Sequence, residues 1–246
     1  MPWSRATDFR LASPSEMRAL DTFLARLREH QLAPLVALLV AALALLGFLK
    51  LGSEMAECET QAFDLALLYA LRRPGDPHDP IGPRWLERAT EDLTSLGSVA
   101  VLSLVIGAAV GYLAISRKRR DAVALIFATS GGLLLSNGLK RIYDRPRPDL
   151  IPDAVAHLNA SFPSGHAMLS AVTYFTLATL LARAQKDPRV TAYLYTVAFA
   201  TTLLIGTTRV YLGLHWPSDV AAGWCVGAAW AILCRLVVDQ VMGRRS

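Results

Sequence analysis

The chain has 246 residues, 53% of them hydrophobic, and its mean hydropathy is +0.36. The apolar residues gather in blocks long enough to cross a bilayer, which takes about 20 residues, and this excludes an ordinary soluble globular protein. The formal net charge of +5 comes from short basic clusters beside the apolar blocks. We interpret these clusters as signals of membrane topology and expect no nucleic-acid partner.

The first 32 residues are expected to form a cytoplasmic segment before a membrane domain of residues 33–246. Ser13, Pro14 and Glu16 have the pattern of a helix start. The apolar residues that follow recur on one helical face: Met17, Leu20, Phe23, Leu24 and Leu27. We therefore predict an amphipathic helix on the inner leaflet. No small-residue cleavage site follows the first apolar block, so this block is expected to remain as an anchor.

Six apolar blocks predict six membrane-spanning helices. They cover residues 33–49, 93–116, 122–139, 164–184, 190–207 and 219–241. The predicted fold is therefore all-α: a bundle of six transmembrane helices with amphipathic surface helices.

The long connection between the first two blocks has structure of its own. Four apolar residues indicate a second surface helix: Phe63, Leu67, Leu68 and Leu71. Prolines at positions 74, 77, 80 and 83 then break the chain before a short helix near Arg84. This segment either covers or flanks a functional site, or is a solvated loop with incidental apolar residues; the sequence leaves both open.

The distribution of charge predicts the orientation in the membrane. Residues 117–120 are all basic, whereas residues 54–92 carry nine acidic and four basic residues. Because Lys and Arg concentrate in cytoplasmic turns, the first segment is expected inside and the second outside. Alternation then places both termini inside, and the connections 140–163 and 208–218 outside. We expect a protein of a bacterial inner membrane whose polar motifs face the periplasm.

A basic cluster directly follows the third apolar block. Its four cations lie within eight residues on the predicted external side, where topology alone disfavours them: Lys140, Arg141, Arg145 and Arg147. Arg offers a planar fork for two phosphate oxygens and Lys a point charge, so a phosphate group is the natural partner. Taken alone, the cluster fits anionic lipid headgroups equally well.

A helix start with an adjacent histidine opens the fourth block. Ser164 is a good N-cap, and Gly165 lets the backbone approach a ligand. The first turn should therefore present free N–H groups and the positive end of the helix dipole to an anion. His166 lies beside this cradle as a potential proton donor. A lone histidine at a helix start is more often structural.

A third group of polar residues lies between the fifth and sixth blocks. His215 and Asp219 are four residues apart at a helix start, so the carboxylate can bind one ring nitrogen. The other nitrogen is then free to act as a nucleophile or base. Arg209 offers a further fork for the same anion. Alone, this stretch fits an interfacial histidine with an Asp cap and an aromatic-belt Trp216.

Together, the three groups resemble a known family. Residues 140–148 fit K-x6-R-P, residues 163–166 are P-S-G-H, and residues 209–219 fit R-x5-H-x3-D. These motifs resemble, in order and spacing, the three signatures of the type 2 phosphatidic acid phosphatase superfamily, which also includes the vanadium haloperoxidases. The one departure is Thr208, where the family pattern has Ser before the arginine.

The resemblance implies a membrane lipid phosphatase that works through a phosphohistidine. His215 would attack phosphorus, Asp219 would hold its ring, and His166 would protonate the leaving oxygen. Five groups would hold the phosphoryl oxygens: Lys140, Arg147, Ser164, Gly165 and Arg209. No cofactor and no metal is expected, because cations and backbone donors can stabilise the spread negative charge of phosphoryl transfer. The three cysteines are odd in number and irregularly spaced, which argues against a disulfide framework or a zinc site.

The expected substrate is a phosphorylated lipid, either a phosphate monoester or a diphosphate. Candidates are a polyprenyl diphosphate, phosphatidic acid, phosphatidylglycerophosphate and phosphorylated lipid A. Two alternatives remain open: a lipid phosphotransferase that passes the phosphoryl group to another acceptor, and a non-enzymatic membrane protein that binds headgroups. The six spans disfavour a soluble haloperoxidase. Nothing in the sequence indicates an oligomeric state.

Overall fold

The computed structural model describes residues 14–150 and 160–241, with side chains over residues 32–150 and 160–240. The chain divides into two units, residues 1–39 and 40–246. All the predicted site residues lie in the second unit.

The first helix, α1 (Pro14–Ala56), runs without a break from the predicted surface helix into the first predicted span. Its start at Pro14 agrees with the predicted N-terminal signal. The helix continues because good helix formers dominate this stretch, no Gly occurs before Gly47, and Pro34 is its one internal proline. The apolar face predicted between Met17 and Leu27 lies outside the described side chains.

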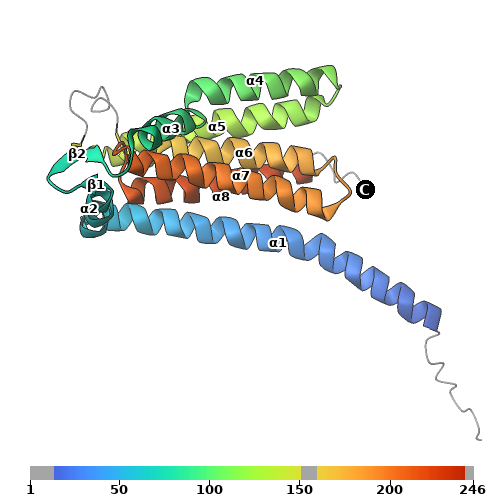
Figure 1. Cartoon of the computed structure of the whole chain (residues 1–246). Coiled ribbons are helices and arrows are strands. Elements are labelled where there is room, and N and C mark those ends of the chain that lie inside the picture. The colour runs from blue at the N-terminus through green and yellow to red at the C-terminus, as the bar shows by residue number, and fades with distance from the viewer. Residues whose placement is uncertain (1–13, 151–159, 242–246) are drawn as a thin grey trace, which may run out of the picture. The chain divides into compact units, whose positions relative to one another are not determined.

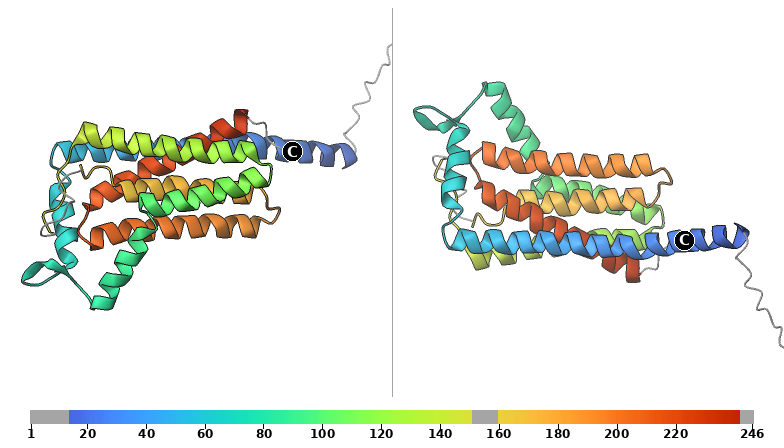
Figure 2. Two further views of the ribbon diagram at one scale, coloured as in Figure 1. Left: turned by 90° about the horizontal axis from the view of Figure 1, so that it is seen from above. Right: turned by 90° about the horizontal axis from the view of Figure 1, so that it is seen from below.

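Five helices of the second unit lie side by side (Figures 1 and 2). They are α4 (Val99–Ile115), α5 (Arg119–Tyr143), α6 (Gly165–Ala182), α7 (Pro188–Tyr211) and α8 (Pro217–Val241). Helix α6 is central, since it contacts α4, α5, α7 and α8. The predicted all-α bundle is thus confirmed, and the helix that begins at the predicted anion cradle lies at its centre.

The second predicted span, residues 93–116, is the one that needs correction. Residues 93–95 end a separate helix, α3 (Arg84–Ser95), which meets α4 at 47°. The break occurs because Ser98 caps α4: its hydroxyl accepts a hydrogen bond from the Val101 N–H at 3.2 Å. Among the described residues, five helices are long and apolar enough to span a membrane, or six if this bent pair is one span.

Helices α6 and α8 approach closely because α8 carries two glycines four residues apart. A Cβ atom at Gly223 would lie 2.7 Å from the carbonyl oxygen of Ser164, and one at Gly227 would lie 2.7 Å from that of Met168. Small residues at this spacing let two membrane helices pack backbone to backbone. The contact fixes the start of α6 against the first turns of α8.

The connection between α1 and α4 packs against one end of this bundle. It contains the predicted surface helix, α2 (Gln61–Ala70), and a hairpin that the sequence did not indicate, β1 (Arg72–Arg73) with β2 (Asp76–Pro80). Leu68 of α2 is buried against Leu150 and Val220. The segment therefore flanks the bundle instead of forming a solvated loop.

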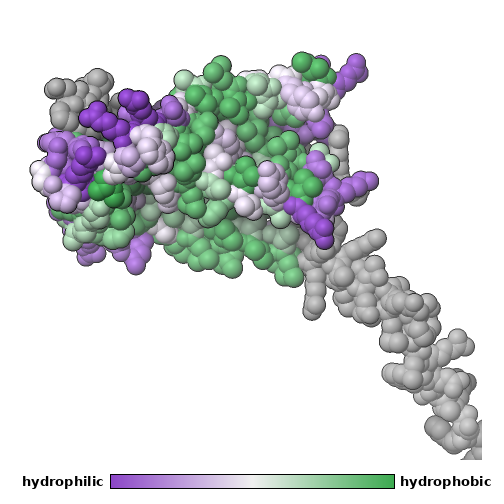
Figure 3. Space-filling view, in the orientation of Figure 1, coloured by the Kyte–Doolittle hydropathy of each residue, from purple (hydrophilic) through white to green (hydrophobic). Residues whose placement is uncertain are grey.

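The sides of the bundle are apolar and its ends are polar. Figure 3 shows hydrophobic residues along the helices and hydrophilic residues towards both ends. Large apolar side chains face outward, among them Leu104 at 74% exposure, Leu134 at 73% and Ile115 at 86%. Such a surface is suited to contact with lipid chains, in agreement with the predicted spans.

Candidate active site at one end of the bundle

The predicted site residues come from four helix ends that meet at one end of the bundle. Neighbouring helices run antiparallel, so the last turns of α5 and α7 lie beside the first turns of α6 and α8. Lys140 and Arg209 lie on the two last turns, while His166 and Asp219 lie on the two first turns. The fold therefore brings together motifs that are up to 79 residues apart in the sequence.

The histidine and carboxylate predicted to act together are in contact. His215 Nδ1 lies 3.3 Å from Asp219 Oδ2, and both side chains are buried. The same oxygen accepts a hydrogen bond from the Trp216 N–H at 3.1 Å, so Asp219 also caps the start of α8. The sequence left open whether Asp219 caps the helix or binds His215. In the structure it does both.

Arg147 shows which ring nitrogen of His215 carries the proton. Its Nη1 lies 3.2 Å from His215 Nε2 and 2.7 Å from the Leu214 carbonyl oxygen. A guanidinium can only donate, so Nε2 must accept and the proton must lie on Nδ1, which points at Asp219. The lone pair of Nε2 is therefore directed away from the carboxylate.

The environment of His215 favours the neutral ring. Burial lowers the pKa of His215 well below its ordinary value, and the positive charges of Arg147 and Arg209 act in the same direction. The ring is therefore uncharged at neutral pH, as a nitrogen nucleophile must be.

The predicted cradle at the start of α6 lies beside a cation. Ser164 occupies the N-cap position, but its hydroxyl does not cap the helix and has no hydrogen-bond partner in the described part of the chain. A Cβ atom at Gly165 would lie 3.7 Å from Cε of Lys140 and 3.9 Å from its Nζ. Lys140 donates to the Ala160 carbonyl oxygen at 3.0 Å. The free hydroxyl, the helix start and the ammonium group therefore converge on one region.

His166 and Arg209 belong to the same group. His166 is close enough to His215, Lys140 and Arg209 for direct electrostatic interaction. The ring of His166 also packs on the bend between α3 and α4, since a Cβ atom at Gly97 would lie 3.2 Å from its Cδ2. Arg209 is buried, and its Nη1 donates to the Thr94 hydroxyl at 3.2 Å.

Two of these cations lack a carboxylate partner within the described residues. Lys140 binds a carbonyl oxygen and Arg209 a hydroxyl, and neither takes part in an ion pair there. The Nε of Arg209 is buried and has no hydrogen-bond partner in the same part of the chain. Buried positive charge of this kind is costly unless an anion balances it. A doubly charged anion such as a phosphate group would meet that need.

Sequence reasoning missed two charged residues that the structure places directly behind the site. Arg145 binds Asp219 Oδ1 at 2.6 Å and Asp64 Oδ2 at 2.8 Å. The remaining basic residue of the cluster, Arg141, is exposed. Arg145 could have been recognised from the basic cluster, but Asp64 is one of nine acidic residues in its segment and carried no distinguishing signal.

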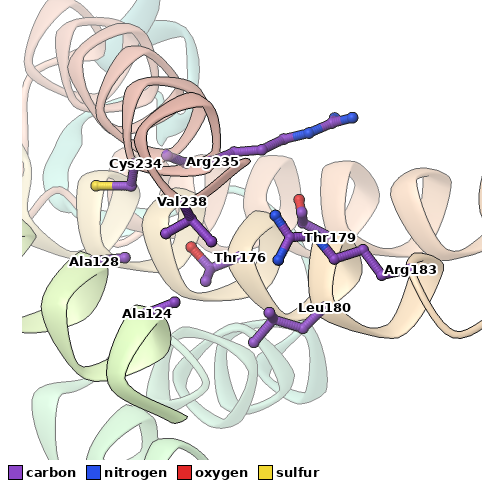
Figure 4. A pocket seen from close by; sticks show the side chains of 10 residues that line it. Ala124, Ala128, Thr176, Thr179, Leu180, Arg183, Cys234, Arg235 and Val238 are labelled. Carbon is purple, nitrogen blue, oxygen red and sulfur yellow. The ribbon is translucent and has the colours of Figure 1, made fainter. Parts of the chain in front are cut away.

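A hollow at the other end of the bundle has no part in this arrangement. Figure 4 shows its lining, which comes from α5, α6 and α8 and includes Ala128, Thr176 and Arg183. Arg183 and His166 lie at opposite ends of α6, about 25 Å apart at 1.5 Å per residue. None of the predicted site residues lines this hollow. Over the described ranges, no three His, Cys, Asp or Glu side chains come together as a metal site would require.

The fold and the site define a helical membrane protein with two histidines and three cations gathered at one end. The pattern of the PAP2 superfamily matches residues 121–242. Phosphatidylglycerophosphatase B of Bacillus subtilis (strain 168) is 32% identical over 150 residues, which is 58% of this chain and 70% of that protein. Lipid A 1-phosphatase of Rhizobium etli is 30% identical over 187 residues, covering 64% of this chain and 75% of the relative.

A solved structure agrees with these sequence matches. The crystal structure of a transmembrane PAP2 type phosphatidylglycerolphosphate phosphatase from Bacillus subtilis superimposes with a TM-score of 0.72 at 27% identity, over 84% of this chain and 98% of that one. The chain belongs to the PAP2 superfamily, as its three motifs suggested, and it is an integral membrane protein of that family.

Proposed function

We propose that this protein is a membrane lipid phosphatase that removes a phosphate from a phosphate monoester or diphosphate lipid through a phosphohistidine on His215. The observation that carries the proposal is the pairing of His215 with Asp219 and Arg147 beside two cations that have no carboxylate partner among the described residues. Its relatives support the class of substrate, since they include a phosphatidylglycerophosphatase and a lipid A 1-phosphatase.

His215 is the proposed nucleophile. Its Nε2 lone pair forms the bond to phosphorus while the bond between phosphorus and the lipid oxygen breaks. The ring then becomes cationic with its proton still on Nδ1, and the Asp219 carboxylate at 3.3 Å stabilises that charge. Arg147 donates to Nε2 in the free site, so it must transfer this hydrogen bond to a phosphoryl oxygen when the substrate binds.

His166 is the proposed proton donor and later the base. It gives a proton to the lipid oxygen as this group leaves, and then takes a proton from the water that attacks the phosphohistidine. The second attack breaks the bond between phosphorus and Nε2 and releases inorganic phosphate. His166 ends the cycle protonated, ready for the next lipid.

The remaining predicted residues are assigned to binding the phosphoryl group. Lys140 and Arg209 supply charge, and the Ser164 hydroxyl with the Gly165 N–H supplies neutral donors. Phosphoryl transfer depends mainly on such positioning and charge stabilisation, so these groups are sufficient without a metal ion. The site lies at the end of the spanning helices, where a lipid phosphate can arrive while its chains stay in the bilayer.

The test is phosphate release from a panel of lipids by the purified protein in liposomes. The panel contains phosphatidylglycerophosphate, phosphatidic acid, a polyprenyl diphosphate and phosphorylated lipid A, each assayed with and without EDTA. We expect release from at least one lipid, unaffected by EDTA, and a loss of about three orders of magnitude or more in His215→Ala.

Three results would contradict this proposal in different ways. Near-normal release of phosphate by His215→Ala would show that His215 is not the nucleophile. Inhibition by EDTA would indicate a metal-dependent reaction. Transfer of the phosphoryl group to an added lipid alcohol, with no free phosphate, would identify a phosphotransferase.

A further inference from the structure

A buried acidic residue from outside the spanning helices contacts the site from behind. Asp64 lies on α2 and is completely buried. Its Oδ1 accepts a hydrogen bond from the Ser218 N–H at 2.9 Å, and its Oδ2 accepts one from the Ser218 hydroxyl at 2.5 Å. Ser218 is the residue directly before Asp219, so α2 is attached to the first turn of α8.

Arg145 joins this carboxylate to the one that holds His215. Its Nη2 donates to Asp64 at 2.8 Å, and its Nη1 donates to Asp219 at 2.6 Å and to the Ser218 hydroxyl at 2.8 Å. Its guanidinium carbon lies 5.3 Å from the centre of the Trp216 ring, which adds a cation–π contact. A lysine in this place would lose the planar fork that gives each carboxylate its own nitrogen.

The hydrogen bonds leave Asp219 with one possible orientation. Its Oδ1 is held by Arg145, and its Oδ2 by the Trp216 N–H and by His215. With this orientation fixed, Oδ2 remains directed at the Nδ1–H of the ring. Through Asp219, Arg145 therefore supports from the Nδ1 side the same tautomer that the contact with Arg147 favours from the Nε2 side.

The balance of charge explains why a second carboxylate is present. Arg145 alone would cancel the charge of Asp219, and the pair would offer little to the cation that forms on His215. With Asp64, two carboxylates share one guanidinium, and the buried cluster keeps one net negative charge. At short range in a buried environment, such a charge strongly stabilises a cationic ring.

We propose that Asp64 is a positioning residue of the catalytic centre: acting through Arg145 and Asp219, it holds the His215 ring in the reactive tautomer and stabilises its positive charge. The inference rests on the function proposed above. It assigns a role to the segment between α1 and α4, namely that α2 is a part of the active site rather than a cover for it.

The central test is a double-mutant cycle on kcat. Asp64→Asn is expected to lower kcat on the order of 10- to 100-fold, as loss of an outer partner commonly does, with KM within about twofold because the phosphate-binding cations are untouched. In a chain that already carries Asp219→Asn, the same change is expected to cost less than about twofold, since both residues act through one carboxylate.

A second readout follows the ring directly. In protein labelled with 15N-histidine, His215 is expected to show the Nδ1–H tautomer in the wild type and a mixture with the Nε2–H tautomer in Asp64→Asn. Glu59→Gln is the matched control, because it removes one negative charge from an exposed position next to α2. It is expected to leave kcat and the ring spectrum unchanged.

The outcomes separate this inference from the proposed function. If Asp219→Asn and His215→Ala keep near-normal activity, the proposed function fails. Suppose instead that those variants are impaired. The role of Asp64 alone then fails if Asp64→Asn is fully active, or if its loss of kcat is as large beside Asp219→Asn as in the wild type. If Asp64→Asn does not fold, Ser218→Ala replaces it in the cycle: an additive effect overturns the inference, and a loss that disappears beside Asp219→Asn supports it.

Discussion

At the scale of single residues, the protonation of His215 follows from where it lies. The ring is buried beside cations, and this lowers its pKa well below the ordinary value. A histidine that is neutral in the folded chain but protonated in the unfolded chain makes folding less favourable in acid. Its effect on stability is absent above the unfolded pKa of about 6.5 and grows as the pH falls from there towards the folded pKa.

The first prediction concerns this titration. We expect the 15N signals of His215 to keep the shifts of a neutral ring between pH 7.5 and 5.5 in the folded protein. The same signals should titrate near pH 6.5 when the chain is unfolded in denaturant. A folded-state titration near 6.5 would mean that water reaches the ring, and would contradict the buried environment.

The second prediction concerns a cation. Arg209→Ala is expected to lower kcat on the order of 100-fold or more, because Arg209 is buried and its Nε has no partner among the described residues. Arg141→Ala is the control, since this arginine of the basic cluster is exposed. Equal activity of the two variants in phosphate-release assays would show that Arg209 does not bind the phosphoryl group.

Two residue pairs show what the sequence could predict. His215 and Asp219 are four residues apart, so their contact could be inferred from helix geometry. Arg145 and Asp64 are 81 residues apart, and no local pattern links them. Only the fold, which packs α2 on the first turn of α8, brings the second pair together.

At the scale of elements, the apolar blocks predicted the helices because a spanning helix needs a long run of apolar residues. The bend at Gly97 was missed because α3 and α4 follow each other with only three residues between them. The short hairpin was missed because the prolines of its segment normally disfavour strands. The bend matters for the site, since it contacts His166.

The third prediction tests the packing of α8 on α6. Gly227→Ala is expected to destabilise the protein by about 1–3 kcal/mol, because its new Cβ atom would lie 2.7 Å from a backbone oxygen that cannot move aside. Gly111→Ala in α4 is the matched control, since nothing lies within 4 Å of its Cβ position. It is expected to be neutral or to stabilise by up to about 1 kcal/mol through helix propensity.

Thermal unfolding in detergent measures the melting temperature of each glycine variant. A lower melting temperature for Gly227→Ala alone would agree with the close helix contact. Equal effects of the two substitutions would show that helix propensity, and not the contact between α6 and α8, determines the result.

At the scale of the whole molecule, the distribution of charge predicts which side of the membrane holds the site. The basic turn at residues 117–120 and the acidic segment at residues 54–92 lie at opposite ends of α4. If the basic turn is cytoplasmic, His215 and its partners face the periplasm. A lipid phosphatase with this orientation acts on lipids of the outer leaflet of the inner membrane.

The fourth prediction uses a natural cysteine to test this orientation. Cys58 is exposed between α1 and α2, at the end that holds the site, whereas Cys225 and Cys234 lie within α8. In bacterial cells whose outer membrane admits the reagent, a charged maleimide that cannot cross the inner membrane is expected to label the wild type, and Cys58→Ser is expected to abolish labelling.

A second cysteine, at the end of the bundle away from the site, provides the opposite readout. Ser116 is exposed at the end of α4, beside the basic turn. When Ser116→Cys is combined with Cys58→Ser, labelling is expected only after the inner membrane is permeabilised. The reverse pattern, with Ser116→Cys labelled in intact cells and Cys58 protected, would place the site in the cytoplasm. The substrate would then have to come from the inner leaflet, although the chemistry at His215 would be unchanged.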